Sequence, residues 1–414
     1  MLTRPRLLTM AILLSMSLLL LAAIYYVRNP VGPGLPAEIS APEYRRAREA
    51  FELKYRKVAD QIDVLSWIAE RKLASNDPAD AIPCFAAIPT SHPKYGHMAR
   101  YQQGQILLKL HRAVEAEQQF RELIAAEEAT PVLEPRRLIN ARGNLRHILE
   151  VELRFEERQR LLTGVVERRE EDAFEAVVYC FPTVLRWNGP ESILWLEQFH
   201  AAGPHSPWLE IALGRYRTGQ GRLDEARPIL ERIYQEQPTN LWAAAALIAC
   251  LQECGDLDRA AELLEKLPPQ SEDDPWQLLT LRGSFALQNG NADVALAAYE
   301  QMLQQVRTCT EAWQGLAQAA QLKNDIERRT KALGMVAALG RIQNHLGKPL
   351  QNAADPNSFL DVADLCGEYN LLREGALMVR AAIQRAPQNE RVLVTRKAFR
   401  ERLAKEGLPA LLGP

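Results

Sequence analysis

Residues that can end a helix recur at almost constant spacing in the second half of this 414-residue chain. Gly221, Gly255, Gly290 and Asn324 are separated by 34, 35 and 34 residues. Glycine and asparagine tolerate the left-handed backbone conformation that often closes a helix. Each of them therefore marks a turn between two helices, and the spacing predicts a series of helical hairpins.

Apolar residues of defined size recur with the same period on both sides of these turns. A small residue allows two helices to approach closely, and a large apolar residue fills the space between one hairpin and the next. The recurring positions are Gly214, Ile248, Gly283 and Ala317 before the turn, then Ala226, Ala260, Ala295 and Arg329, then Leu230, Leu264, Tyr299 and Leu333. Only Ile248 and Arg329 depart from the expected type.

This pattern resembles the tetratricopeptide repeat (TPR), a pair of antiparallel helices. The resemblance implies an all-α fold, an α-solenoid in which the hairpins form a right-handed superhelix. The clear units span 207–343. Degenerate TPR-like repeats are expected over 43–206, and a last TPR-like unit with a charged capping helix over 344–414.

The N-terminus contains an uncharged apolar stretch, Leu7–Val27. As a helix it would extend about 31 Å, close to the thickness of a membrane interior. We therefore predict an N-terminal transmembrane helix within 1–28, with a cleaved signal sequence as the alternative. Arg4 and Arg6 precede the stretch, which favours a single-pass protein of a bacterial-type inner (cytoplasmic) membrane with its bulk on the exported side.

The next segments differ in composition from the repeats. Residues 29–42 hold four prolines and two glycines, which predicts a stiff Pro/Gly tether. A long helix is expected from about Glu43 to Ala74. Its apolar stripe either packs on the first repeat, which we favour, or forms a coiled-coil stalk.

Composition and motifs argue against several classes of function. Lys and Arg total 50 against 52 Asp and Glu, so no nucleic-acid partner is expected. The six scattered cysteines read as small core residues, His92 and His97 as surface histidines, and Glu167–Asp172 as a solvated face or loop. No catalytic or phosphate-binding motif occurs, so we expect a non-enzyme without cofactor or metal.

The first helix of each hairpin should line the concave side of the array. The groove candidates on that side are Trp208, Ile211, Arg215, Trp242, Thr280, Ser284, Gln314 and Gln318. TPR proteins that grip a carboxylate use several Lys, Arg and Asn residues there, whereas this chain offers only Arg215. The tryptophans instead suit an extended or helical peptide, or simply pack against the preceding unit.

Two functions follow from this reading. The first is a membrane-tethered TPR scaffold that binds a protein or peptide in its groove and assembles an envelope complex. The second is a non-catalytic accessory subunit for lipid or polysaccharide export. The sequence identifies neither the partner nor the oligomeric state.

Overall fold

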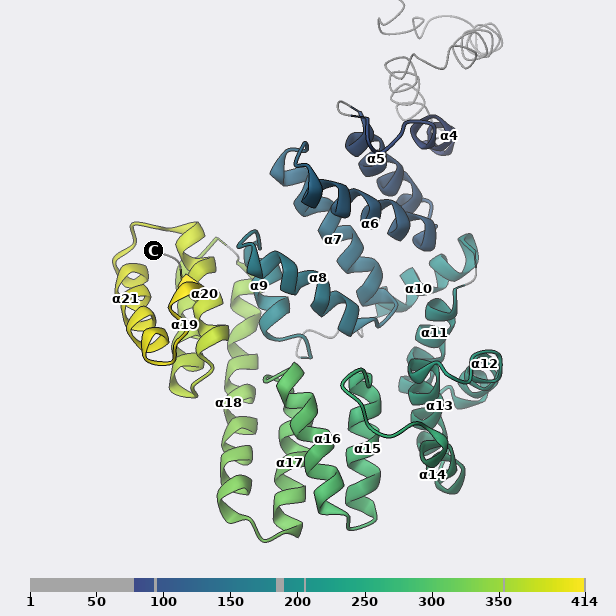
Figure 1. The fold of residues 1–414 in the computed structure, drawn as a ribbon, viewed down its shortest axis with the longest axis vertical. Coiled ribbons are helices and arrows are strands. Elements are labelled where there is room, and N and C mark those ends of the chain that lie inside the picture. Colours follow the sequence, from purple (N-terminus) through teal and green to yellow (C-terminus); the bar gives the residue numbers. More distant parts are fainter. Residues whose placement is uncertain (1–77, 93–94, 184–189, 205, 353, 413–414) are drawn as a thin grey trace, which may run out of the picture. The chain divides into compact units, whose positions relative to one another are not determined.

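The computed structural model describes residues 78–412 except 93–94, 184–189, 205 and 353 (Figure 1). All regular elements in this part of the chain are helices, which confirms the predicted all-α class. The chain divides into two compact units. Unit 1 runs to Leu145 and includes Ala201–Pro204, and unit 2 comprises Arg146–His200 and His205–Pro414.

Unit 1 is a short helical array. Its elements are the 3₁₀ turn η1 (Pro78–Ala81), α4 (Ile82–Ala86), α5 (Gly96–Lys109), α6 (Ala113–Ala129) and the first part of α7 (Pro135–Val151). Helices α5 and α6 form a hairpin. A methyl group added at Gly104 of α5 would lie 2.7 Å from the ring of Phe120 on α6, so a glycine is required at this contact.

Unit 2 contains the clear repeats and the elements on either side of them. After the end of α7 its helices are α8 (Phe155–Glu167), α9 (Ala173–Cys180), α10 (Pro190–Ala202), α11 (Pro207–Gly219), α12 (Leu223–Glu236), α13 (Leu241–Glu253), α14 (Leu257–Lys266), α15 (Trp276–Gln288), α16 (Ala292–Gln305), α17 (Thr310–Leu322), α18 (Ile326–Gln351), α19 (Pro356–Glu368), α20 (Leu372–Arg385), α21 (Glu390–Lys405) and the 3₁₀ turn η2 (Pro409–Leu412).

The predicted turn residues lie where the hairpins reverse. Gly221, Gly255 and Gly290 have φ angles of 73°, 77° and 71°, and Asn324 has 57°. These values fall in the left-handed region that glycine and asparagine tolerate. The turns of the clear repeats are therefore confirmed.

The small residues of the pattern also mark close helix contacts. A methyl group at Gly214 would lie 2.5 Å from the side chain of Leu230, and one at Gly283 would lie 2.5 Å from the ring of Tyr299. Real contacts of that kind essentially never occur, so a larger residue requires the facing side chain or its helix to move. In each pair the large residue is the one that the periodic pattern predicts.

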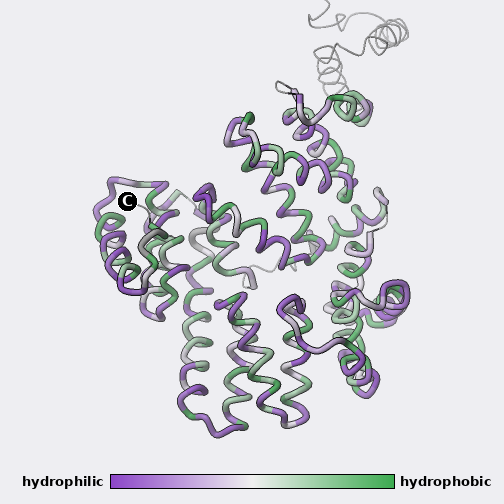
Figure 2. The backbone as a smooth tube through the Cα atoms, viewed as in Figure 1, coloured by the Kyte–Doolittle hydropathy of each residue, from purple (hydrophilic) through white to green (hydrophobic). Residues whose placement is uncertain are grey.

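From α11 to α21 consecutive helices pack on one another, except that α15 packs on α13 rather than on α14, and α21 closes the series. Val392, Phe399 and Leu403 of α21 are buried while the rest of the helix is largely exposed. Figure 2 shows hydrophobic and hydrophilic stretches alternating along these helices, as expected where one face is buried. Helix α21 thus lies within the segment predicted to cap the array.

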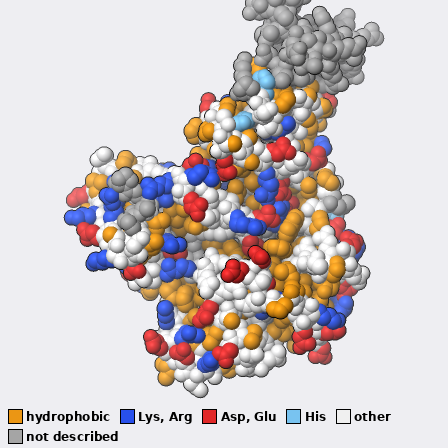
Figure 3. Space-filling model, viewed as in Figure 1, with side chains coloured by type: hydrophobic (Ala, Val, Ile, Leu, Met, Phe, Trp, Pro, Cys, Tyr) orange, Lys and Arg blue, Asp and Glu red, His pale blue; other side chains and the backbone are white. Residues whose placement is uncertain are grey.

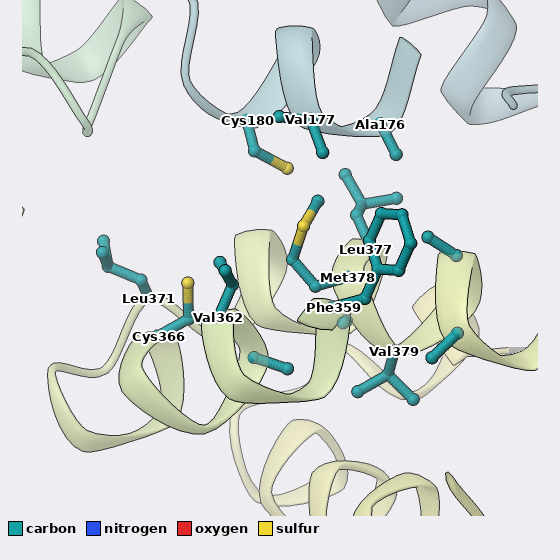
Figure 4. Close-up of a cluster of buried hydrophobic side chains, with 14 of the residues drawn as sticks. Ala176, Val177, Cys180, Phe359, Val362, Cys366, Leu371, Leu377, Met378 and Val379 are labelled. Atoms are coloured by element: carbon teal, nitrogen blue, oxygen red, sulfur yellow. The ribbon is translucent and has the colours of Figure 1, made fainter. Parts of the chain in front are cut away.

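A second contact in unit 2 joins distant parts of the sequence. Residues 146–183, here called the bridging segment, include α8 and α9, and α9 packs against α20. Figure 4 shows Val177 and Cys180 pointing toward Met378 and Phe359 in one buried cluster. The repeat pattern predicts contacts between successive hairpins only, so this packing was not predicted.

The cysteines are free thiols, and five of the six are buried. Burial raises the pKa of the Cys180 and Cys366 thiols well above the usual value. Both belong to the cluster between α9 and the last repeat pair. Their expected role as small core residues is confirmed, and Cys254 alone is partly exposed.

Two predictions about surface residues are wrong. His97 is only 8% exposed, because its Nδ1 atom contacts the Glu127 carboxylate, which also accepts the backbone N–H groups of Val132 and Leu133. Within the expected solvated run, Glu171 is buried and accepts a hydrogen bond of 2.6 Å from Arg380 of α20. In both cases a partner distant in sequence compensates the buried charge.

The predicted localisation is corrected as well. The part of the chain that the structure describes holds no helix with the length and apolar character needed to cross a membrane, which conflicts with the predicted single-pass inner-membrane protein. The Leu7–Val27 stretch, the Pro/Gly tether and the whole of the predicted long helix lie outside the described residues. The domain boundaries at 206/207 and 343/344 stay predictions.

Candidate functional site

Unit 2 contains a cavity of about 850 Å³. One wall consists of residues from the first helices of successive hairpins, α11, α13, α15 and α17, with Met302 from α16. The opposite wall comes from Leu153, Phe155 and Glu156 of the bridging segment, together with its last residues, Pro182 and Thr183. A cavity of this size suits a small molecule or a short stretch of polypeptide.

Helix periodicity selects the residues of the repeat wall. On α13, Trp242, Ala246, Ala249 and Glu253 lie three or four residues apart, so all four side chains share one face. On α15 the lining residues include Trp276 and Thr280, again one turn apart. Two neighbouring helix faces of this wall, on α13 and α15, therefore each carry a tryptophan in the first turn of the helix.

The bridging segment is attached to this wall by two hydrogen bonds, which it accepts through one backbone carbonyl oxygen and one side-chain carboxylate. Arg215 Nη1 donates to the carbonyl oxygen of Leu153 at 3.1 Å. The backbone N–H of Trp276 donates to Glu156 Oε1 at 2.8 Å. Trp276 is the first residue of α15, whose N–H would otherwise lack a helical partner. Glu156 therefore caps a helix that lies 120 residues further along the chain.

The two tryptophans of the first clear repeats contact each other. The ring of Trp208 meets that of Trp242 edge-on, with centroids 5.3 Å apart. The Arg154 guanidinium lies 5.0 Å from the Trp208 ring centroid and also bonds to Glu152 and Glu157. Trp208 is thus held by Arg154 and Trp242, whereas Trp242 itself borders the cavity.

Hydrogen bonds fix the third tryptophan of the series. Trp276 Nε1 donates to Gln305 Oε1 at 2.8 Å, and Thr280 Oγ1 donates to the Trp276 carbonyl oxygen at 3.0 Å. Trp276 is 6% exposed, so its indole N–H needs the partner that it has. These bonds hold the aromatic part of the wall in one arrangement.

The charged residues of the lining are mostly acidic. They are Glu156, Glu253 and Glu311 against the single cation Arg215. Among the described residues Glu253 forms no ion pair. Tyr216 also lines the cavity, and burial raises the pKa of its hydroxyl, while a hydrogen bond with Ser192 acts in the opposite direction. The phenol is therefore neutral, and the lining carries a net negative charge.

The predicted groove residues do not all lie at this cavity. Arg215, Trp242 and Thr280 line it, and Trp208 stands directly behind Trp242. Ile211 is buried in the core, Ser284 Oγ donates to the Leu281 carbonyl oxygen, and both Gln314 and Gln318 are exposed outside the lining. A binding role for any of these residues stays a prediction.

Sequence reasoning missed Phe155, Glu156 and Trp276. One available signal pointed to Trp276, since Trp208, Trp242 and Trp276 are 34 residues apart. Phe155 and Glu156 carry no comparable signal, because they belong to the bridging segment and reach the cavity through tertiary contacts.

The lining offers several kinds of group that can bind a ligand. It contains no histidine or cysteine, and no cluster of metal-ligating side chains occurs anywhere in the part of the chain described by the structure. Aromatic rings, carboxylates and one guanidinium can recognise a ligand by packing, hydrogen bonding and charge.

Comparison with known proteins agrees with the helical hairpins. Two segments, residues 68–131 and 217–282, match models described as tetratricopeptide repeat. These two segments are therefore tetratricopeptide repeats, a repeat type that generally occurs in protein-interaction scaffolds and is typically non-catalytic. A search of curated proteins finds no match to the sequence.

Solved structures with a similar arrangement of helices include several TPR proteins. The chain is 12% identical to a chain of the APC/C hetero-tetramer Cut9-Hcn1, with a TM-score of 0.35 over 82% of its length and 64% of the other. A TPR protein from Parabacteroides merdae gives 14% identity and a TM-score of 0.30, covering 62% and 98%. The TPR domain of P58(IPK) gives 13% and 0.26, covering 84% and 99%. Scores this low do not bear on function.

Proposed function

We propose that the protein is a scaffold that binds a segment of a partner protein in the cavity of unit 2. The observation that carries this proposal is the position of the cavity on the first helices of successive hairpins, where Trp242 and Trp276 border it. Aromatic residues in such hollows are frequent anchors of protein interfaces, since they bury a large apolar area at little conformational cost.

The bridging segment supports binding of a narrow ligand rather than a broad surface. Its residues Phe155 and Glu156 form the wall opposite the repeats, so the concave side of α11–α15 is bounded instead of open. A folded domain does not fit into about 850 Å³, whereas a short extended or helical segment does.

Site-specific photocrosslinking tests the proposal. Gln277 and Gln288 both lie on α15, but only Gln277 lines the cavity. A photoreactive amino acid at position 277 is expected to trap a partner protein in cells, and the same amino acid at position 288 is not. Mass spectrometry of the crosslinked products identifies the partner.

A substitution sharpens this test. Trp242→Ala should abolish the crosslink formed at position 277. Trp313→Ala serves as a matched control, since Trp313 is also partly buried, lies on α17 and does not line the cavity. Equal crosslinking from positions 277 and 288, or a crosslink insensitive to Trp242→Ala in a folded variant, would exclude the cavity as the binding site.

A further inference from the structure

We infer that the segment bound in the cavity carries lysine or arginine side chains. This inference rests on the proposed function and adds the chemistry of the partner. Three features of the lining carry it: its charge, its aromatic rings, and the way in which both are held.

The charge of the lining is complementary to a basic segment. The lining contains three carboxylates, those of Glu156, Glu253 and Glu311, and one guanidinium, that of Arg215. It therefore carries a net charge of 1 − 3 = −2. Figure 3 shows acidic and hydrophobic side chains next to each other near the middle of one face. In a hollow with apolar walls such a charge attracts cations more strongly than it would on an open surface.

The single cation of the lining is directed toward the bridging segment. Arg215 Nη1 donates to the Leu153 carbonyl oxygen at 3.1 Å, so this guanidinium has a structural partner in the opposite wall. Glu253 has no ionic partner among the described residues and lies at the end of α13. The charge available to a ligand is therefore mainly acidic.

Aromatic rings of the lining favour the same class of ligand. Phe155, Trp242 and Trp276 border the cavity from α8, α13 and α15. Lysine and arginine pack their apolar stems and their cationic groups against aromatic rings, and tryptophan is the preferred partner. An acidic segment would gain the apolar contact and lose the electrostatic one.

The lining is also held in place before any ligand arrives. Glu156 accepts the Trp276 backbone N–H at 2.8 Å, and Trp276 Nε1 donates to Gln305. Groups that are already ordered lose little conformational entropy on binding. The acidic and aromatic parts of the lining thus form one preorganised site.

The test measures binding of short fluorescent peptides to the full chain by anisotropy. In the three peptides glycine and serine alternate with arginine, with lysine or with glutamate. We expect the arginine and lysine peptides to bind, the affinity to fall as salt increases, and the glutamate peptide not to bind. A lining that binds the three peptides equally, or none of them, overturns the inference.

Charge-neutralising variants locate the binding. Glu253→Gln combined with Glu311→Gln should weaken binding of the arginine peptide about tenfold, since each exposed ion pair contributes modestly. The control is Glu265→Gln with Glu401→Gln, which changes the net charge equally at exposed positions outside the lining and should leave the affinity unchanged. Equal losses in the two double variants would mean nonspecific attraction and would overturn the inference.

This experiment and the crosslinking experiment can fail independently. A partner trapped at position 277 together with no preference among the peptides leaves the scaffold function intact and removes the basic ligand. Failure of crosslinking removes the proposed function itself.

Discussion

The clear repeats and the bridging segment use different interactions to form one unit. In 207–343, neighbouring hairpins pack through alanine, glycine and leucine, and the contacts are close in sequence. The bridging segment buries charged side chains instead, including Arg158, which is fully buried and bonds to Glu150 and to the Pro182 carbonyl oxygen. Its partners outside itself lie as far as 213 residues away.

The difference separates what repeats provide from what specifies this particular protein. Apolar contacts between hairpins can be repeated any number of times without defining where a distant segment binds. A buried ion pair is costly unless its partners meet correctly, so it penalises every wrong placement of the bridging segment. The repeats form one side of the cavity, and the charged contacts determine where the bridging segment lies on the other side.

The largest expected change in the free energy of unfolding comes from breaking a buried ion pair. Arg158→Met leaves Glu150 buried with Arg146 as its remaining ionic partner, and should lower the free energy of unfolding by about 3 kcal/mol in urea titrations. Arg222→Met removes an exposed pair with Glu225 in a clear repeat and should not change stability measurably. Equal effects would show that the two regions do not differ in this way.

The second-largest expected change in stability comes from disturbing a close helix contact in the clear repeats. Gly283→Leu should destabilise the protein by about 2 kcal/mol, because the new side chain collides with Tyr299. Gly334→Ala, on α18 where the added methyl group meets nothing within 4 Å, should stabilise by about 0.5 kcal/mol. Thermal denaturation measures both, and a stable Gly283→Leu protein would contradict the helix packing.

Substitutions of turn residues should change stability less, and in opposite directions in the two regions. Gly221 of the clear repeats and Arg169 of the bridging segment both have positive φ, 73° and 60°. Gly221→Ala should cost about 1 kcal/mol, whereas Arg169→Gly should gain up to about 1 kcal/mol, because only glycine adopts this conformation without strain. The shift in the denaturation midpoint of each variant tests the expectation.

The smallest effect is a pH dependence in the bridging segment. The His147 ring meets Trp195 edge-on at 5.1 Å, and burial lowers the pKa of His147, opposed by Glu150 and reinforced by Arg146. The folded state therefore favours the neutral ring. Its contribution to stability is present above the unfolded pKa of 6.5 and is lost as pH falls below it.

Thermal denaturation at neutral and at mildly acidic pH checks this dependence. The wild type should lose stability on acidification, and His147→Gln should lose less, because glutamine does not titrate. An equal loss in the two proteins would assign the dependence to other groups.

The same comparison explains how far the sequence was informative. The period of Gly221, Gly255 and Gly290 predicted the turns because one residue type suits that conformation. Leu153 and Arg169 adopt it too, with φ of 56° and 60°, but no periodic glycine marks them, so these divergent turns were missed. Tertiary packing overrides local preference at those positions.

The candidate site was predictable only on its repeat side. Arg215, Trp242 and Thr280 follow from helix periodicity, since residues at the same position of successive units face the same way. Phe155 and Glu156 reach the cavity because Glu156 caps α15 and the bridging segment packs on α20. Contacts of such long sequence separation leave no local pattern to read.

The packing of α9 against α20 has a consequence for the newly made chain. Glu171 and Arg380 are 209 residues apart, so the ribosome completes α9 long before its partner helix exists. At about 5–20 residues per second, the interval is roughly 10–40 s. During this time the apolar side of α9, with Val177 and Cys180, has no native surface to cover it. Synthesis of this protein therefore includes a waiting period in which a chaperone can recognise one specific short helix.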